Sequence, residues 1–119
     1  MREPIRDKGR LEHMLEAIDN VHEFTKDITF EGLAGNKMLR HAVTHNIQII
    51  GEAAYKLTSE FCASHTEVPW RDIIGLRHVL VHDYYRIDIP ELWIIIREEL
   101  PPLKEQIEAL IKESSGDGD

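Results

Sequence analysis

Apolar residues recur at helical spacing along almost the whole chain. In the first segment the apolar positions are three and four residues apart, and acidic side chains fall between them. This apolar set consists of Leu11, Met14, Leu15, Ile18, Val21 and Phe24. The pattern predicts an amphipathic first helix that buries one face, and Pro4 stands where such a helix can begin. The broken pattern over residues 26–35 indicates a loop or a short turn.

The second segment, residues 36–61, has the longest run of helical spacing. On a helical wheel its apolar residues fill one arc, which predicts a helix with one buried face. Asn46 is the exception, because it falls inside the apolar arc. Gly51 and the alanines that follow it are small enough to let another helix approach closely. The polar side of the wheel holds His41, His45, Gln48 and Glu52.

A third helix is predicted over residues 70–81, and a link should follow it over residues 83–89. Asp88 is suited to cap the next helix, because a glutamate, Glu91, follows three residues later. The sequence therefore predicts that a new helix begins at this point and runs to about Leu100.

A pair of prolines, Pro101–Pro102, comes directly after that helix. Because proline lacks an N–H group and restricts the residue before it, the pair predicts a break or a sharp kink. A last helix is expected over residues 103–113, and residues 114–119 should form a flexible tail. With no strand alternation and no internal repeat, the sequence predicts an all-α fold: an antiparallel bundle of four to five helices, in a single domain of residues 1–113.

The composition limits the classes of function. The chain has 119 residues and a formal net charge of −8, from 14 Lys and Arg against 22 Asp and Glu. An acidic chain of this kind is not expected to coat DNA or to be held on anionic lipid by charge. The single cysteine, Cys62, cannot form an internal disulfide, and no apolar run approaches the ~18 residues that cross a bilayer. We therefore expect a cytoplasmic protein with no membrane partner and no DNA partner.

Arg77 is the most unusual residue of the third helix. Its neighbours on the same face are Ile73, Ile74, Leu80, Val81 and Tyr84. A lone guanidinium among apolar groups is too costly to bury without a partner. The sequence leaves two alternatives open: a structural ion pair, for which Glu52 is a candidate, or a cleft in which Arg77 faces an anion.

His82 follows Arg77 by five residues, which places it about 140° away around a regular helix. The two side chains converge only if the helix unwinds near Val81 or if a second chain completes the site. Together they suit phosphate chemistry without a metal, because histidine moves a proton near neutral pH and arginine holds a phosphate through two hydrogen bonds. The alternative is that His82 caps the helix or is solvated.

A second histidine pattern mimics a metal-ligand set. His41 and His45 are four residues apart, and Glu52 shares their face of the predicted helix. That face is also the polar side of the helix, so the solvated interpretation is favoured. We expect neither a metal nor any other cofactor.

The stretch from Val68 to Tyr84 strongly resembles the HepT-like branch of the HEPN superfamily. In that family a tryptophan-containing lead-in precedes an arginine, four to six variable residues, a histidine, one residue and a tyrosine. Arg77, His82, Asp83 and Tyr84 match this pattern as Arg-x4-His-x-Tyr.

Residues 46–54 are similar to the second-helix signature of the same family, and the resemblance covers about residues 5–112. The visible departure is His45, which stands where the family often carries an arginine.

The resemblance implies the toxin of a type VII-like toxin–antitoxin pair that cleaves RNA without a metal. It assigns the phosphate contact to Arg77 and proton transfer to His82, and it makes Asn46, Arg71 and Asp83 supporting or RNA-binding residues. It also implies a homodimer whose two motifs line a shared cleft.

The partner that the resemblance implies is a minimal nucleotidyltransferase antitoxin, which attaches AMP to Tyr84. The expected dimer seam is the third and fourth helices, with Trp70, Val79, Tyr85 or Trp93 among its contacts. A rival interpretation is a non-catalytic helical accessory subunit of a nucleotidyltransferase, and a third is a purely structural dimerisation domain.

Overall fold

The computed structural model describes residues 3–79 and 88–117. Every regular element in these two stretches is helical and none is a strand, which confirms the predicted all-α fold. The elements in order are α1 (Glu3–Thr25), α2 (Phe30–Ala34), α3 (Lys37–Tyr55), α4 (Ser59–Ser64), α5 (Trp70–Val79), α6 (Ile89–Ile94), a π-helical turn η1 (Ile95–Glu99) and α7 (Leu100–Asp117). No helix within these stretches is long and apolar enough to cross a membrane.

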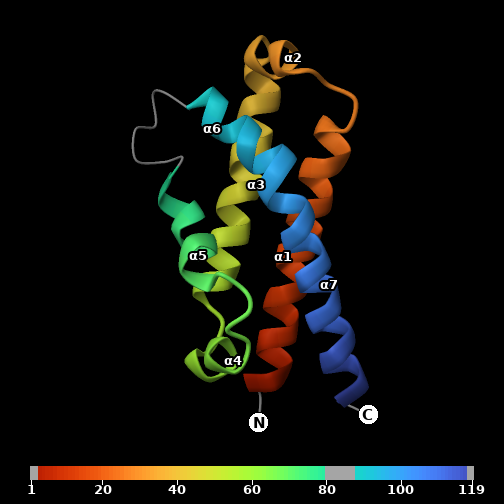
Figure 1. Ribbon diagram of the computed structural model, residues 1–119, viewed down its shortest axis with the longest axis vertical. Coiled ribbons are helices and arrows are strands. Elements are labelled where there is room, and N and C mark those ends of the chain that lie inside the picture. Colours follow the sequence, from red (N-terminus) through yellow and green to blue (C-terminus); the bar gives the residue numbers. More distant parts are fainter. Residues whose placement is uncertain (1–2, 80–87, 118–119) are drawn as a thin grey trace.

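The four longer helices lie side by side in the order α5, α3, α1, α7 (Figure 1). Neighbours in this row run in opposite directions, so the described helices form an antiparallel bundle. The helix α3 contacts α1 on one side and α5 on the other, and α7 packs on α1. The short helices α2 and α6 meet at one end of the bundle, and α4 lies at the other end.

One cluster of apolar side chains forms the core. The apolar face predicted for α1 is buried at Leu11, Met14, Ile18 and Val21, whereas Leu15 is partly buried and Phe24, near the end of the helix, is 41% exposed. The largest side chains that are almost fully buried come from α1, α2, α3, the segment 89–99 and α7: Leu11, Met14, Ile18, Val21, Leu33, Val43, Ile47, Ile50, Leu92, Ile95 and Ile107.

The predicted single segment over residues 36–61 is wrong at its end, because the chain turns after Tyr55 and starts α4. The buried carboxylate of Asp7 accepts hydrogen bonds from the backbone N–H of Thr58 at 2.9 Å and from its hydroxyl at 2.7 Å. The same hydroxyl accepts the N–H of Phe61 and so caps α4. A contact with α1, about fifty residues earlier in the chain, therefore fixes the turn between α3 and α4.

The predicted break at Pro101–Pro102 is also wrong. The helical path runs from Ile89 to Asp117, and the N–H of Leu100 bonds to the carbonyl of Ile95 in the π-helical turn. Proline lacks the N–H group of a regular helix and clashes with the carbonyl four residues before it. The wider π-helical turn lies directly before both prolines, which is where the chain departs from regular α-helical bonding while the path stays helical.

Arg97 ties this segment to the end of α1. Its Nη2 donates to the carbonyl of Thr25 at 3.1 Å and to that of Ile28 at 2.7 Å. Its guanidinium also lies 4.4 Å from the ring centroid of Trp93, which meets Phe30 edge-on. The segment over 26–35, expected as a loop or short turn, contains the short helix α2. Arg97 holds the turn before α2, because it bonds to the carbonyls of Thr25 and Ile28 on either side of that turn.

His65 joins the link before α5 to α7. Its Nδ1 lies 3.0 Å from the carbonyl oxygen of Phe61, and its Nε2 lies 3.2 Å from a carboxylate oxygen of Glu113. The pKa of His65 is raised, first by the hydrogen bond to the Phe61 carbonyl and then by Glu113, while desolvation opposes the shift. The protonated ring is therefore the form that this contact favours.

We expect the contribution of His65 to stability to depend on pH. A raised pKa in the folded chain gives a stabilisation that is full below the ordinary histidine pKa of about 6.5 and is lost as the pH rises through the raised value. His65→Gln should lower the free energy of unfolding more near pH 5.5 than near pH 8.5, by less than about 1 kcal/mol because Glu113 is largely exposed.

Urea unfolding at the two pH values measures this difference, with His13→Gln as the control because His13 is exposed in the middle of α1. Equal losses for His65→Gln at both pH values would contradict the account.

Candidate functional site

Arg77 lies on α5 where this helix packs against α3. Its guanidinium carbon is 3.5 Å from the ring centroid of Tyr55, and its Nη1 is 3.7 Å from a carboxylate oxygen of Glu52. Glu52 and Tyr55 are three residues apart, so both project from the end of α3 toward the same neighbour. We call these three side chains the arginine clasp.

The arginine clasp leaves part of the guanidinium unsatisfied. The Nε atom of Arg77 is buried and has no hydrogen-bond partner among the described residues. The contact to Glu52, at 3.7 Å, is longer than a direct hydrogen bond. The predicted ion pair is therefore present but loose, and Arg77, with 23% of its side chain exposed, keeps donors for another acceptor.

Gly51 sets the distance between the two helices of the clasp. A Cβ atom at this position would lie 2.5 Å from the backbone N of Arg77 and 3.1 Å from the carbonyl oxygen of Ile73. The backbone of α5 therefore rests directly on α3, as the small residues predicted. This contact positions Arg77 within reach of Glu52 and Tyr55.

Asn46 is buried, as its place in the apolar arc predicted. Its Oδ1 accepts a hydrogen bond from Nδ2 of Asn20 at 3.0 Å, and its own Nδ2 donates to the carbonyl of Ala42 at 2.9 Å. The bond with Asn20 joins α3 to α1, on the side away from α5, whereas the bond to Ala42 lies within α3. Within the described residues, no hydrogen bond or ion pair joins Asn46 to Arg77.

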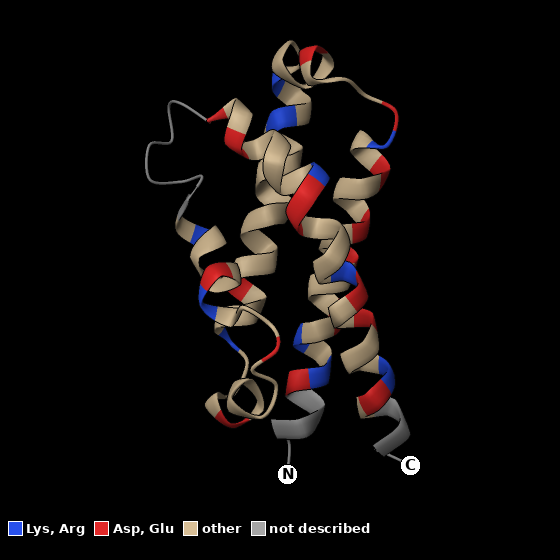
Figure 2. Cartoon of the chain, in the orientation of Figure 1, with Lys and Arg blue, Asp and Glu red and all other residues tan. Residues whose placement is uncertain are grey.

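The other motif positions divide between described and undescribed parts of the chain. Arg71 is exposed in the first turn of α5, and Figure 2 shows basic residues at both ends of this helix. His82, Asp83 and Tyr84 lie outside the described residues. The convergence of His82 with Arg77 thus stays a prediction.

The histidines that mimic a metal-ligand set are solvated. His41 and His45 are both exposed on α3, which confirms the polar-face interpretation. Across residues 3–79 and 88–117, no group of three or more His, Cys, Asp or Glu side chains is arranged to hold a metal ion.

The two tryptophans differ in their availability for a dimer seam. Trp70 is 7% exposed, and its indole Nε1 donates to the carbonyl of His65 at 2.9 Å, so it belongs to the core of its own chain. This burial argues against a place for Trp70 at a seam, which stays a prediction. Trp93 is half-buried and remains a candidate.

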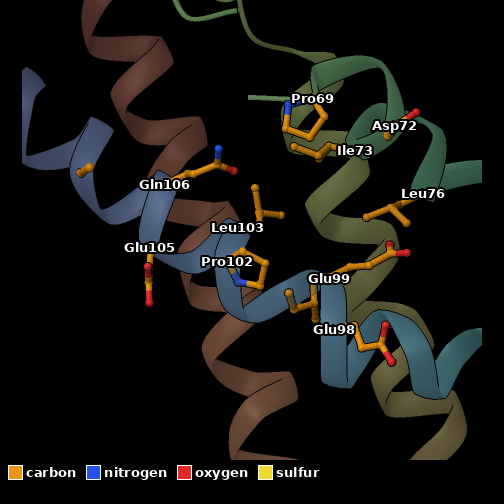
Figure 3. Close-up of a pocket in the computed structure, with 12 residues that line it drawn as sticks. Pro69, Asp72, Ile73, Leu76, Glu98, Glu99, Pro102, Leu103, Glu105 and Gln106 are labelled. Atoms are coloured by element: carbon orange, nitrogen blue, oxygen red, sulfur yellow. The ribbon is translucent and has the colours of Figure 1, made fainter. Parts of the chain in front are cut away.

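A groove of about 790 Å³ separates α5 from α7 and is distinct from the arginine clasp. Its floor is apolar, with Ile73, Leu76 and Leu103 among the residues that line it (Figure 3). Its other lining residues include four carboxylates, Asp72, Glu98, Glu99 and Glu105, and neither lysine nor arginine. An RNA phosphate is repelled by such a rim, so the groove is not the phosphate site.

The sequence analysis missed Tyr55. The available signal was its spacing of three residues from Glu52 on one predicted helix, which places both side chains on the same surface. The contact with Arg77 is tertiary, and no spacing within one helix reveals it.

Comparisons with known proteins agree with the motif. The family model described as "Ribonuclease HepT-like" matches residues 14–110. The chain is 41% identical to "Putative RNase MJ1380" of Methanocaldococcus jannaschii, over 85% of this chain and 93% of the relative. It is 38% identical to "Probable ribonuclease HepT" of Thermococcus cleftensis, over 88% of this chain and 96% of the relative.

A third relative is "Putative RNase TTE0752" of Caldanaerobacter subterraneus subsp. tengcongensis, 34% identical over 86% of this chain and 91% of the relative. No solved structure matches the chain significantly.

The contact at Gly51 gives a test of how the clasp is positioned. Gly51→Ala places a methyl group against the backbone of α5, which cannot yield by a side-chain rotation, so we expect a loss of about 1–3 kcal/mol in the free energy of unfolding. Gly75→Ala on α5 is the matched control, because a Cβ there meets nothing within 4 Å. It should be neutral or stabilise by up to about 1 kcal/mol.

Urea unfolding of both variants makes the comparison. A Gly51→Ala chain as stable as the Gly75→Ala chain would show that the helices do not depend on this contact.

Proposed function

Because the chain belongs to the HepT-like ribonuclease family, we propose that it is a metal-independent endoribonuclease, the toxin of a type VII-like toxin–antitoxin pair. The observation that carries this proposal is Arg77, a half-buried guanidinium whose buried Nε has no hydrogen-bond partner, and whose one carboxylate contact is loose, among residues 3–79 and 88–117. A phosphate oxygen is the acceptor that such a group suits best, since charge-assisted hydrogen bonds to phosphate are strong and directional.

The proposed reaction is an internal transesterification. The ribose 2′-oxygen forms a bond to phosphorus, the bond from phosphorus to the 5′-oxygen breaks, and the 2′-hydroxyl proton leaves while the 5′-oxygen gains one. His82 takes or delivers one of these protons, a role typically worth about 10²–10⁴ in rate. Arg77 binds the scissile phosphate and stabilises the extra negative charge that develops on it.

The acidic surface supports selectivity rather than opposing RNA binding. Because the chain has a net charge of −8, it attracts RNA only where basic groups gather, at Arg77 and near Arg71 on the same helix. Asn46 and Asp83 are proposed to support the site at Arg77. Asn46 does so from a buried position on α3, the helix against which α5 packs.

A homodimer completes the proposed site. Five residues separate Arg77 from His82, about 140° on a regular helix, so a second copy offers a way to bring an arginine and a histidine to one phosphate. The half-buried Trp93 and the end of α5 are the proposed seam.

The proposed partner is a minimal nucleotidyltransferase that modifies Tyr84. Its phenol oxygen attacks the α-phosphorus of ATP, loses its proton and releases pyrophosphate, which leaves AMP on the tyrosine. The new phosphate then competes with RNA for Arg77 and blocks the cleft.

Loss of cleavage in point variants tests the enzyme. Arg77→Ala and His82→Ala should each abolish cleavage of total RNA, because one removes the phosphate contact and the other the proton transfer. His41→Ala, on the exposed polar face of α3, is the control and should cleave as the unaltered chain does. EDTA should have no effect, and the products should carry a 2′,3′-cyclic phosphate and a 5′-hydroxyl.

Cleavage that persists in either variant, with the fold intact, would contradict this mechanism. No cleavage by the unaltered chain would favour the non-catalytic accessory subunit instead, and 5′-phosphate ends would point to water as the attacking group.

Modification of Tyr84 is tested by co-expression with the neighbouring nucleotidyltransferase. Tyr84→Phe should remain an active nuclease but resist neutralisation, because it lacks the hydroxyl that accepts AMP. Mass spectrometry should find the added AMP mass on Tyr84 and not on Tyr85. A fully neutralised sample with unmodified Tyr84 would mean that the partner inhibits by binding alone.

A further inference from the structure

Tyr55 is a large aromatic residue that the fold leaves 53% exposed. One face of its ring is already occupied, because the guanidinium carbon of Arg77 lies 3.5 Å from the ring centroid. The exposed surface therefore belongs mainly to the other face and the ring edge. Burying this exposed aromatic surface against an apolar partner is favourable, so the ring is suited to bind a ligand that carries a flat apolar group.

The position of Tyr55 sets what that partner can be. Arg77 is the proposed phosphate contact, and the ring lies in van der Waals contact with it. A ligand that reaches both groups must carry a phosphate and a flat apolar surface joined by a short linker. A nucleotide has this composition, with one ribose between its phosphate and its base.

We propose that Tyr55 is a stacking site for a nucleobase of the RNA substrate, next to the phosphate that Arg77 holds. The inference rests on the proposed function, since it takes RNA as the ligand. Every base has a π-face, so the site accepts any base and does not read sequence. It requires a base that is free to leave its own stack, which favours single-stranded loops and ends over duplex RNA.

Glu52 fits the same arrangement as a replaceable counter-ion. Its carboxylate neutralises Arg77 from 3.7 Å, and with 51% of its side chain exposed it returns to water at little cost. An arriving phosphate then takes the guanidinium while the base takes the free surface of Tyr55. One nucleotide thus makes two favourable contacts: its phosphate bonds to Arg77, and its base stacks on the neighbouring Tyr55.

A purely structural role of Tyr55 makes a different prediction. If the ring only holds Arg77 in place, its loss weakens the phosphate contact for every ligand, with or without bases. If the ring stacks a base, its loss affects only ligands that carry bases. Binding of a base-free backbone therefore separates the two roles.

The experiment uses the full chain with His82→Ala, so that RNA is bound but not cleaved. Two fluorescent probes of equal length are compared by anisotropy: a single-stranded oligoribonucleotide of mixed sequence and an abasic ribose-phosphate oligomer. Tyr55→Leu should weaken binding of the first about tenfold and leave binding of the second unchanged. Tyr55→Trp should bind both probes as the parent chain does, because it keeps an aromatic face.

Phe24→Leu is the matched control, because Phe24 is also an exposed aromatic residue, 41% exposed, but lies on α1 away from the arginine clasp. It should leave both affinities unchanged. Circular dichroism confirms that each variant is folded.

An equal loss on both probes would overturn the stacking site and leave Tyr55 as a positioning residue. No loss on either probe would overturn both roles. Cleavage of total RNA by the unaltered chain is measured separately, so absence of cleavage counts against the proposed function, whereas unchanged binding by Tyr55→Leu in a chain that cleaves counts against Tyr55 alone.

Discussion

The backbone contact between α3 and α5 at Gly51 is the constraint on which the site depends. Because no side chain separates the helices there, Arg77 leaves α5 directly beside the end of α3 and meets Glu52 and Tyr55. The same helix α3 is held to α1 on its other side by the hydrogen bond between Asn46 and Asn20. Gly51 on one side of α3 and Asn46 on the other thus fix where the cation lies.

Relative strengths explain why the clasp suits a phosphate. The contact with Glu52 is 3.7 Å long and half exposed, and such pairs are typically worth at most about 1 kcal/mol. Hydrogen bonds from a guanidinium to phosphate are roughly twice as strong as neutral ones, and they satisfy the buried Nε as well. The carboxylate holds the charge in place in the absence of a ligand, and we propose that a phosphate displaces it. The acidic groove between α5 and α7 offers no such exchange.

Periodicity predicted the helical class, the buried face of α1 and the place of Asn46 in an apolar face, and it offered the ion pair of Arg77 with Glu52 as one of two alternatives. It failed at two places. The turn after Tyr55 depends on a contact with the distant Asp7, and the helical path through Pro101–Pro102 depends on a π-helical turn, which apolar spacing does not reveal. Tyr55 escaped for the same reason, because its partner lies on another helix. The motif around His82 came from family resemblance, not from spacing.

The central claim is that the Nε–H of Arg77 bonds to a phosphate of bound RNA. A ¹H–¹⁵N correlation NMR spectrum of the arginine side chains observes this Nε–H group directly. Its signal is assigned as the one that disappears in the Arg77→Lys variant. On saturating the His82→Ala chain with a single-stranded oligoribonucleotide, the signal should move downfield and its exchange with water should slow, as a new hydrogen bond requires. An unmoved, fast-exchanging Nε–H signal in a chain saturated with RNA would contradict the account.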